Sequence, residues 1–195
     1  MSGTNSEREL IAEGPAVILV EPQLGENIGM VARAMANFGL AELRLVKPRD
    51  GWPSEKARAA ASKADHVIDA TKVFDTLEEA IADLNFVYAT TARERYGFKP
   101  VRSPVTAAET LRAKFKAGEK TGVLFGRERW GLTNEEVALA DEIVTFPVNP
   151  AFASLNIAQA VLLMSYEWMK TGLDDVAATP FLAVEQRPSS KEQVF

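Results

Sequence analysis

The feature that most constrains the fold is a repeated alternation of short apolar runs with segments of helical periodicity. The run AVILVE at residues 16–21 is almost continuously apolar and rich in β-branched side chains, which is typical of a strand buried on both faces. Similar runs recur at 43–47, 85–91, 122–125 and 142–148, with helical segments between them. This alternation predicts an α/β domain, in which helices cover both faces of a parallel sheet.

Helices are expected between these strands, and several of their end residues can be predicted. Asn27 suits the N-cap of the first helix, Gly39 the position beyond its last turn, and Ser154 the N-cap of the longest helix. We expect HVID at 66–69 to be a short strand and the polar stretch 92–104 to be a long loop. Helical periodicity covers residues 28–38, 54–62, 75–84, 105–118, 133–140 and 155–169.

The turns that follow the strands are the candidate site, because ligands of parallel α/β sheets bind beyond the carboxyl ends of the strands. These turns read EPQLGEN, TTARER, FGRERWG and PVNPAFASLN after the first, third, fourth and fifth main strands. None carries the G-x-x-x-x-G-K-[ST] phosphate loop or the G-x-G-x-x-G dinucleotide fingerprint. The four turns therefore remain the candidate ligand site, but they contain neither of these two nucleotide-binding motifs.

Two features of the composition narrow the chemistry. The chain has no cysteine, which excludes disulfide scaffolds, thiol nucleophiles and cysteine-ligated metals. His66 is the only histidine, so a multi-histidine metal site is excluded, and so is a catalytic triad that does not use His66. We expect no metal cofactor.

The charge distribution leaves room for a polyanionic partner despite the net charge of -5. Residues 44–63 hold six basic and two acidic residues, and residues 91–120 hold eight basic and three acidic residues. Two basic segments on an acidic protein allow one face to bind a nucleic acid, although solvated surface explains them equally well.

Three residues near the turns have both a structural and a functional interpretation. Arg33 points away from the apolar stripe of the first helix, either into solvent or into a cleft where it holds a phosphate. Glu128 lies between Arg127 and Arg129, in a self-paired surface cluster or in a ligand site. Ser154 is expected to cap its helix, and its hydroxyl can also meet a ligand.

Three ordered segments together resemble a known family. They are ILVEPQLGENIGMVARAMANFGLAELRLVKP, FGRERWGLTNEE and NPAFASLNIAQAV, and they look like the motifs of the TrmH-type ribose 2′-O-methyltransferases of the SPOUT superfamily. TTARER and GRERWGLTNEE further resemble the TrmJ type, which methylates nucleotide 32 of the tRNA anticodon loop. The resemblance runs from residue 16 to 169. It implies an α/β fold with a deep C-terminal trefoil knot, S-adenosylmethionine as cofactor, and a homodimer that acts on tRNA.

The resemblance also implies roles for individual residues by matching position. The cofactor would be held by Thr90, Thr91, Ala92, Gly126, Phe146, Ser154 and Leu155. The catalytic group would comprise Asn27, Arg33, Glu128, Ser154 and Asn156. RNA contacts would come from Arg33, Arg93, Arg95, Lys99 and Arg102. This chain has Ala153 where relatives carry serine, which removes a second hydroxyl beside Ser154.

Arg33 is a poor general base, because a guanidinium has a pKa above about 12. We expect Arg33 to clamp the adjacent phosphate and stabilise the forming alkoxide, while the proton passes to a phosphate oxygen or to water. Two alternatives stay open: a 2′-O-methyltransferase for rRNA or another tRNA position, and an RNA-binding module without catalysis.

We expect three parts in the chain: a loosely ordered N-terminus at 1–15, the methyltransferase domain at 16–170, and a tail or the start of a C-terminal extension at 171–195. No apolar run approaches the roughly 20 residues that span a bilayer. The first residues also lack the layout of a signal peptide. These two observations predict a cytoplasmic protein.

Overall fold

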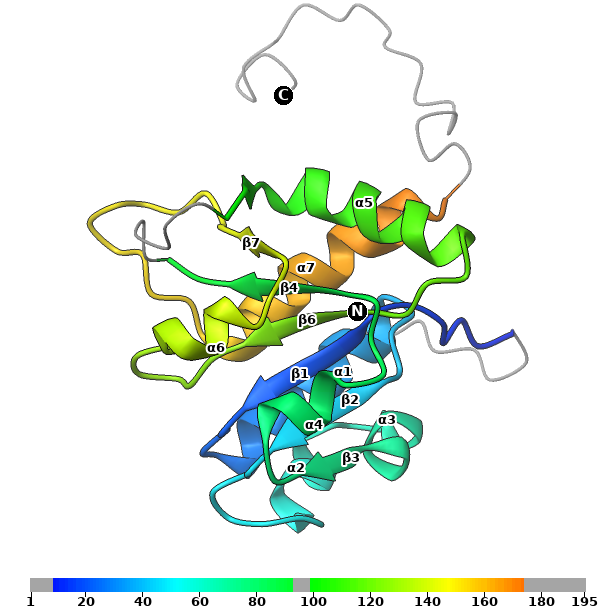
Figure 1. Cartoon of the computed structure of the whole chain (residues 1–195). Helices are drawn as coiled ribbons and strands as arrows, with labels where there is room; N and C mark the ends of the chain where they lie inside the picture. The colour runs from blue at the N-terminus through cyan, green and yellow to red at the C-terminus, as the bar shows by residue number, and fades with distance from the viewer. Residues whose placement is uncertain (1–8, 93–98, 174–195) are drawn as a thin grey trace, which may run out of the picture.

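The computed structural model describes residues 9–92 and 99–173, which form one sheet with helices on both faces (Figure 1). The strands are β1 Ala16–Val20, β2 Leu43–Val46, β3 Lys72–Phe74, β4 Phe86–Thr90, β5 Val101–Arg102, β6 Thr121–Phe125 and β7 Glu142–Val144. The helices are α1 Gly25–Asn37, α2 Glu55–Ala60, α3 Asp65–Ala70, α4 Leu77–Ile81, α5 Pro104–Lys116, α6 Asn134–Ala138 and α7 Ile157–Thr171. Of the helices in the described part of the chain, none combines the length and the apolar character needed to cross a membrane.

The sheet confirms the predicted α/β class. All paired strands are parallel and lie in the order β3-β2-β1-β6-β4-β7-β5. In the centre, Leu19 of β1 pairs with Leu45 of β2 and Phe125 of β6. Every residue of these three strands is buried, which explains why they are mostly apolar; Arg44 of β2 is the charged exception. Because the strands are parallel, the turns after them meet at one edge of the sheet.

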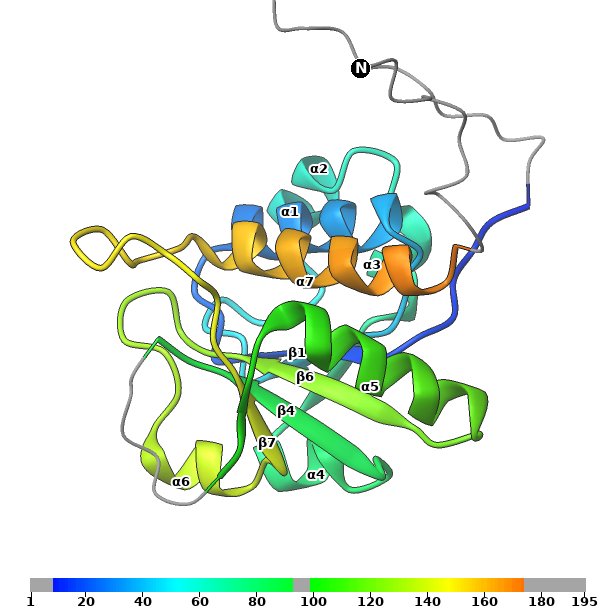
Figure 2. The same ribbon diagram turned by 90° about the horizontal axis from the view of Figure 1, so that it is seen from above.

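Two apolar cores lie on the two faces of the sheet. The larger core packs α1, α2, α3, α5 and α7 against the face that carries Val17, Leu19 and Val123. The smaller core packs α4 and α6 against the opposite face, which carries Ile18 and Leu124. In Figure 2, α1 and α7 lie side by side over one face, and α4 and α6 lie beyond the other. Alternate side chains of β1 and β6 therefore serve both cores.

Two local predictions of secondary structure were wrong, and one strand was missed. The stretch 66–69 lies in helix α3, because Val67 and Ile68 pack together into the larger core. The predicted loop 92–104 contains the two-residue strand β5, which pairs with β7 at the edge of the sheet. Strand β3 was not predicted, since two of its three residues are exposed and it lacks the apolar pattern of a buried strand.

Two of the three predicted helix-end residues do not cap their helices. The N-cap of α1 is Leu24, and Asn27 lies inside the first turn with 7% of its surface exposed. The N-cap of α7 is Asn156 rather than Ser154, because the Asn156 side chain accepts a hydrogen bond from the Ala158 amide at 2.8 Å. Gly39 does follow α1 with a left-handed φ of 80°, as expected beyond a last turn.

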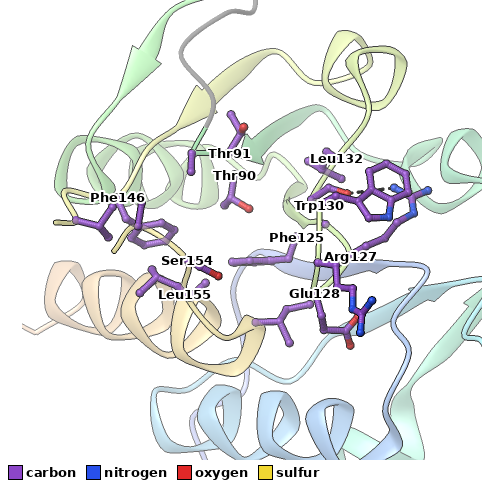
Figure 3. A pocket seen from close by; sticks show the side chains of 18 residues that line it. Thr90, Thr91, Phe125, Arg127, Glu128, Trp130, Leu132, Phe146, Ser154 and Leu155 are labelled. Carbon is purple, nitrogen blue, oxygen red and sulfur yellow. Dashed lines mark hydrogen bonds between the residues drawn. The ribbon is translucent and has the colours of Figure 1, made fainter. Parts of the chain in front are cut away.

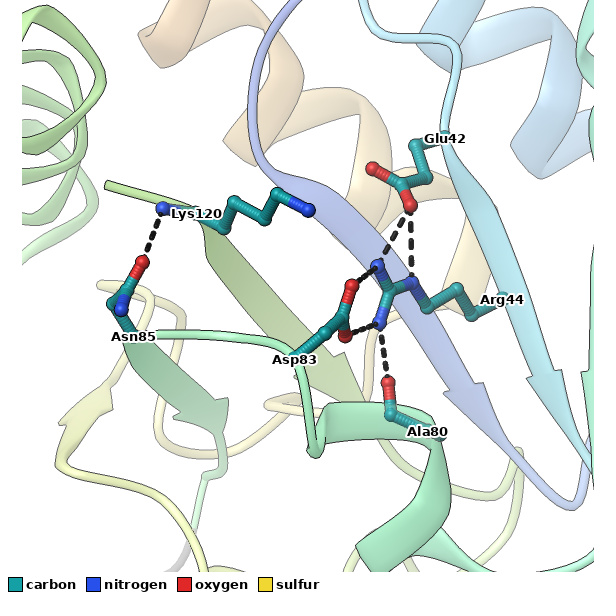
Figure 4. Close-up of polar contacts among 6 residues, drawn as sticks. All are labelled: Glu42, Arg44, Ala80, Asp83, Asn85 and Lys120. Atoms are coloured by element: carbon teal, nitrogen blue, oxygen red, sulfur yellow. Dashed lines mark hydrogen bonds and ion pairs between the residues drawn. The ribbon is translucent and has the colours of Figure 1, made fainter. Parts of the chain in front are cut away.

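A buried arginine holds the amino ends of the strands together (Figure 4). The Arg44 side chain is only 3% exposed and donates to Asp83 at 2.6 and 3.0 Å and to Glu42 at 2.7 and 3.2 Å. It also donates to the Ala80 carbonyl at 2.6 Å. This group, the Arg44 cluster, ties β2 to the end of α4 and to the turn that leads into β4. One arginine of the first basic segment is therefore internal.

Candidate active site

A pocket opens at the carboxyl ends of β4 and β6, where the sequence analysis placed the site. Its volume is about 370 Å³, within the range of about 300–1,000 Å³ that is typical of small-molecule sites. Figure 3 shows Phe146, Ser154 and Leu155 on one side of the pocket, and Arg127, Trp130 and Leu132 on the other. The walls come from three segments of the chain: 90–92, 125–132 and 146–160.

The structure brings all seven predicted cofactor residues to this pocket. They line it together with Glu128 and are Thr90, Thr91, Ala92, Gly126, Phe146, Ser154 and Leu155. The Thr90 hydroxyl donates to the Leu124 carbonyl of the neighbouring strand at 2.7 Å, so its proton is already used within the fold. The sequence reasoning did not assign the apolar walls of Phe125, Trp130, Leu132, Val148, Ile157 and Ala160. Most of them lie in apolar patterns typical of core residues, and Trp130 is a single aromatic residue in a charged loop, so sequence alone could not mark them.

Gly126 is required by the closure of its own loop. A Cβ at residue 126 would lie 2.2 Å from the Gly131 carbonyl carbon and 2.5 Å from the Leu132 nitrogen. The loop closes there because Arg127 and Gly131 exchange backbone hydrogen bonds of 3.0 and 3.2 Å. Gly131 has a φ of 74°, which favours glycine. The loop 126–131 is therefore a tight structure with little tolerance for side chains at its two glycines.

Arg127 is the anchor of this loop. Its guanidinium contacts both oxygens of Glu136 on α6, at 2.7 and 2.9 Å, and it also pairs with Glu21 after β1. It donates to the Gly131 carbonyl at 3.2 Å and lies over the Trp130 ring at 4.3 Å. We call this group the Arg127 cluster. With its side chain only 10% exposed and paired with Glu21 and Glu136, Arg127 has a structural role in the loop.

Glu136 shows how strongly the cluster is coupled. Burial by itself raises the pKa of the Glu136 carboxyl, but hydrogen bonds from Arg127 and Thr133 outweigh burial, so the pKa lies below its ordinary value. The same carboxyl accepts the Thr133 amide at 2.7 Å and closes the capping box of α6. One carboxylate therefore fixes both the start of α6 and the guanidinium that holds the pocket wall.

Glu128 faces the turn between β1 and α1. Its carboxylate accepts the backbone N–H of Gln23, with distances of 3.1 and 3.3 Å to its two oxygens. Arg129, the next residue, is exposed. The loop 126–131 is thus attached to the β1–α1 turn twice, through Glu21 to Arg127 and through Gln23 to Glu128.

Asn27 and Asn156 meet where the amino ends of α1 and α7 come together. The side-chain amide nitrogen of Asn156 (Nδ2) lies 3.5 Å from the side-chain oxygen of Asn27 (Oδ1), at the limit of a hydrogen bond. Neither lines the pocket, but α7 begins directly after its wall residues Ser154 and Leu155. The structure therefore places two of the predicted catalytic residues beside the pocket rather than in it.

Arg33 is the predicted catalytic residue that lies apart from the pocket. It is exposed on α1 and is absent from the pocket lining. The described residues provide it with no hydrogen bond or ion pair. As far as the described residues go, its guanidinium is left for a group from outside them.

The predicted RNA-binding residues differ in their surroundings. Lys99 donates to the Ala140 carbonyl at 2.5 Å, and Arg102 pairs with Glu142 at 3.2 Å. Both side chains are thus engaged within the fold. Arg93 and Arg95 lie outside the described residues.

Comparison with known proteins decides the family. A model of the SpoU rRNA methylase family matches residues 14–166, most of the chain. The chain belongs to this family. A crystal structure of TrmJ from Z. mobilis ZM4 is 58% identical, with a TM-score of 0.77 over 80% of this chain and 68% of that one. These matches confirm the resemblance to the TrmH-type methyltransferases and, among them, to TrmJ.

Two relatives bear names that specify a reaction. The tRNA (cytidine/uridine/adenosine-2′-O-)-methyltransferase TrmJ of Pseudomonas aeruginosa is 38% identical over 177 residues, covering 91% of this chain and 65% of that protein. The tRNA (cytidine-2′-O-)-methyltransferase TrmJ of Methanocaldococcus jannaschii is 34% identical over 177 residues, covering 91% and 75%. The chain thus spans slightly less than two thirds of its Pseudomonas relative.

Proposed function

We propose that this chain uses S-adenosylmethionine to methylate a ribose 2′-hydroxyl in tRNA, at nucleotide 32 of the anticodon loop. The observation that carries the proposal is the pocket itself: the seven residues expected to hold the cofactor come from three distant segments and line one cavity. The names of the two TrmJ relatives support tRNA and the 2′-oxygen. They differ in the bases that they name, so the proposal specifies the position and not the base.

The pocket fits the cofactor in size and chemistry. A volume of about 370 Å³ suits a ligand of this size. Phe125, Leu132 and Phe146 provide apolar walls for a nucleobase, and Ser154 offers a hydroxyl. The Glu128 carboxylate on the wall adds a negative charge, which favours a sulfonium cation.

Bound S-adenosylmethionine supplies an activated methyl group, so the protein must orient the ribose and handle one proton. Arg33 has no internal partner among the described residues, which leaves its forked guanidinium for a backbone phosphate beside the target ribose. In this position it stabilises the negative charge that forms on the 2′-oxygen. Glu128 and the Asn27–Asn156 pair hold the α1 and α7 ends against the pocket.

Assembly is part of the proposal. The outer face of α1 exposes Met30, one turn before Arg33. The neighbouring face of α7 exposes Leu162, Leu163 and Tyr166. We propose that a second copy of the chain covers this apolar face in a homodimer. The expected trefoil knot, the three-part division at residues 15 and 170, and a cytoplasmic location belong to the same family-based proposal.

The family description mentions rRNA, so an rRNA substrate or another tRNA position is the second candidate function. To test the proposal, calorimetry measures S-adenosylmethionine binding, and labelled cofactor is then incubated with an unmodified tRNA transcript. The methylated nucleotide is mapped. We expect methyl transfer to nucleotide 32 and none to a matched transcript with 2′-deoxyribose at that position. Transfer at another tRNA nucleotide contradicts the position. The same assay with an rRNA transcript tests the second candidate, and cofactor binding without methyl transfer to tRNA or rRNA indicates a module without catalysis.

Arg33→Lys tests the role of the forked guanidinium. Loss of one stabilising donor typically lowers turnover by about 10²–10³-fold, and we expect a loss of that order with unchanged cofactor binding. Lys63→Gln, a change of an exposed residue on the same face of the sheet, is the control and should retain turnover. Near-normal turnover of Arg33→Lys would mean that any positive charge suffices.

A further inference from the structure

The first basic segment, residues 44–63, has no role in the site described so far, and the structure sorts its members. Arg44 is buried in its own cluster, and Arg58 pairs with Asp65 and Asp69 at 3.2 and 2.5 Å. Arg49 and Lys56 have side chains that are 53% and 75% exposed, and Lys47 and Lys63 are exposed as well. Among these exposed residues, Arg49 and Lys56 lie beside the β1–α1 turn and the first turn of α1.

The backbone of Arg49 is hydrogen-bonded to the β1–α1 turn, and the same turn binds Glu128. The backbone N–H of Arg49 donates to the Pro22 carbonyl at 3.0 Å, and the next residue, Gln23, donates its N–H to the Glu128 carboxylate. Hydrogen bonding to Asp50 chiefly raises the pKa of the Arg49 guanidinium, and Glu128 adds a smaller electrostatic contribution. Arg49 and the pocket wall are therefore within electrostatic range of each other.

Lys56 lies directly beside the first turn of α1. A Cβ added to Gly25 would lie 3.1 Å from the Lys56 Cβ and 2.6 Å from the Ser54 hydroxyl, so α2 starts in contact with α1. The nearest acid to the Lys56 ammonium is Glu26 on α1, at 4.0 Å. Lys56, Arg49 and the exposed Arg33 thus all belong to α1 or to the segment packed against it.

The strand order separates this surface from the other basic segment. β2, which leads to Arg49, and β5, which carries Arg102, lie on opposite sides of the central pair β1 and β6. On the β5 side, Lys99 and Arg102 are engaged with Ala140 and Glu142. On the β2 side, the acidic neighbours Asp50 and Glu26 form exposed pairs, which are worth only about 0–1 kcal/mol and exchange readily for other anions.

We propose that Arg49 and Lys56 form a phosphate-contact surface that holds the RNA backbone next to the target nucleotide. This proposal rests on the proposed function, because it takes RNA as the substrate. Arg49 is hydrogen-bonded to the β1–α1 turn and Lys56 lies beside the first turn of α1, so an RNA backbone that crosses this turn toward Glu128 can contact both side chains. The contact is electrostatic and independent of sequence, so it contributes affinity and register rather than base recognition.

The test measures binding of an unmodified tRNA transcript by fluorescence anisotropy, over a series of salt concentrations and without cofactor. The Arg49→Gln/Lys56→Gln double variant should bind more weakly, with the salt slope of log K reduced by about 1 for each lost phosphate contact. Lys63→Gln, a change in the same basic segment, is the matched control and should keep the wild-type slope. Both changes affect exposed side chains, and unchanged thermal unfolding verifies folding.

A second measurement needs no variant. Acetylation of lysines in the wild-type protein, read by mass spectrometry, should show Lys56 protected by tRNA and Lys63 modified equally with and without it. An unchanged salt slope in the double variant, or an unprotected Lys56, overturns the proposal. Wild type that binds RNA with the expected slopes but transfers no methyl group supports this surface and contradicts only the proposed activity. A wild type that binds no tRNA contradicts both.

Discussion

The two arginine clusters at opposite ends of the sheet are nearly equivalent in their contacts and differ in their surroundings. Arg44 and Arg127 have side chains 3% and 10% exposed, and each contacts two carboxylates and one backbone carbonyl. Each also lies over an aromatic ring, Phe74 at 5.9 Å or Trp130 at 4.3 Å. The Arg44 cluster lies at the amino ends of the strands and the Arg127 cluster at the carboxyl ends, on the pocket wall (Figures 3 and 4).

Similar local contacts therefore have different consequences at the two ends of the sheet. The same set of bonds ties strands and turns together at one end and shapes the wall of the candidate pocket at the other. Parallel strands create the asymmetry, because all their carboxyl ends face the side on which the ligand binds. We therefore expect changes in the Arg44 cluster to alter stability alone, and changes in the Arg127 cluster to alter binding as well.

The largest effect should come from Arg44→Gln. It leaves Asp83 and Glu42 without their shared cation, and breaking a buried ion pair in this way typically costs about 3–5 kcal/mol, with the lower end expected because both carboxylates are half-exposed. Urea unfolding measures the loss. Calorimetry well below the melting temperature should still give the wild-type affinity for S-adenosylmethionine, and a changed affinity would remove the distinction between the clusters.

Arg127→Gln should have a smaller effect on stability and a clear effect on the pocket. We expect cofactor binding to weaken about tenfold, equivalent to about 1.4 kcal/mol, because the wall loses its anchor to Glu21 and Glu136. Lys63→Gln is the control and should bind normally, since Lys63 is exposed and does not line the pocket. Equal affinities of the two variants would show that the loop holds its shape without Arg127.

The smallest effect concerns acid pH, and it should appear in both clusters. The Arg44 hydrogen bond lowers the pKa of Asp83 below its ordinary 3.8, and that of Glu136 lies below its ordinary 4.5. A carboxyl with a lower pKa in the folded state stabilises the protein fully above its unfolded pKa, and this contribution is lost as the pH falls through the folded-state value. Unfolding free energies should therefore decline below about pH 4.5.

Two variants assign this decline to residues. Glu136→Gln and Asp83→Asn remove the titrating groups, so each should flatten the dependence of the unfolding free energy on pH between pH 5 and 3. If both variants follow the wild-type curve, other carboxyl groups cause the acid sensitivity.

The sequence alone determined the class of fold and the edge of the sheet where the site lies. The continuous apolar run of β1 is typical of a strand buried on both faces, where polar residues are rare. Because parallel strands all end on one side, the turns after β4, β6 and β7 had to meet. That is why Thr90, Gly126 and Ser154 were found together at one pocket.

The roles of individual charged and capping residues depend on contacts between distant parts of the folded chain. Sequence could not separate Arg127 from Arg129, because burial depends on Glu21 and Glu136, which are distant along the chain or on another element. Residues 66–69 became helix α3 because Val67 and Ile68 pack into the larger core. Asn156 took the cap expected at Ser154, since the chain is still extended along the pocket at that point. Periodicity records which side chains are apolar, whereas the partner of a charge depends on contacts that folding creates.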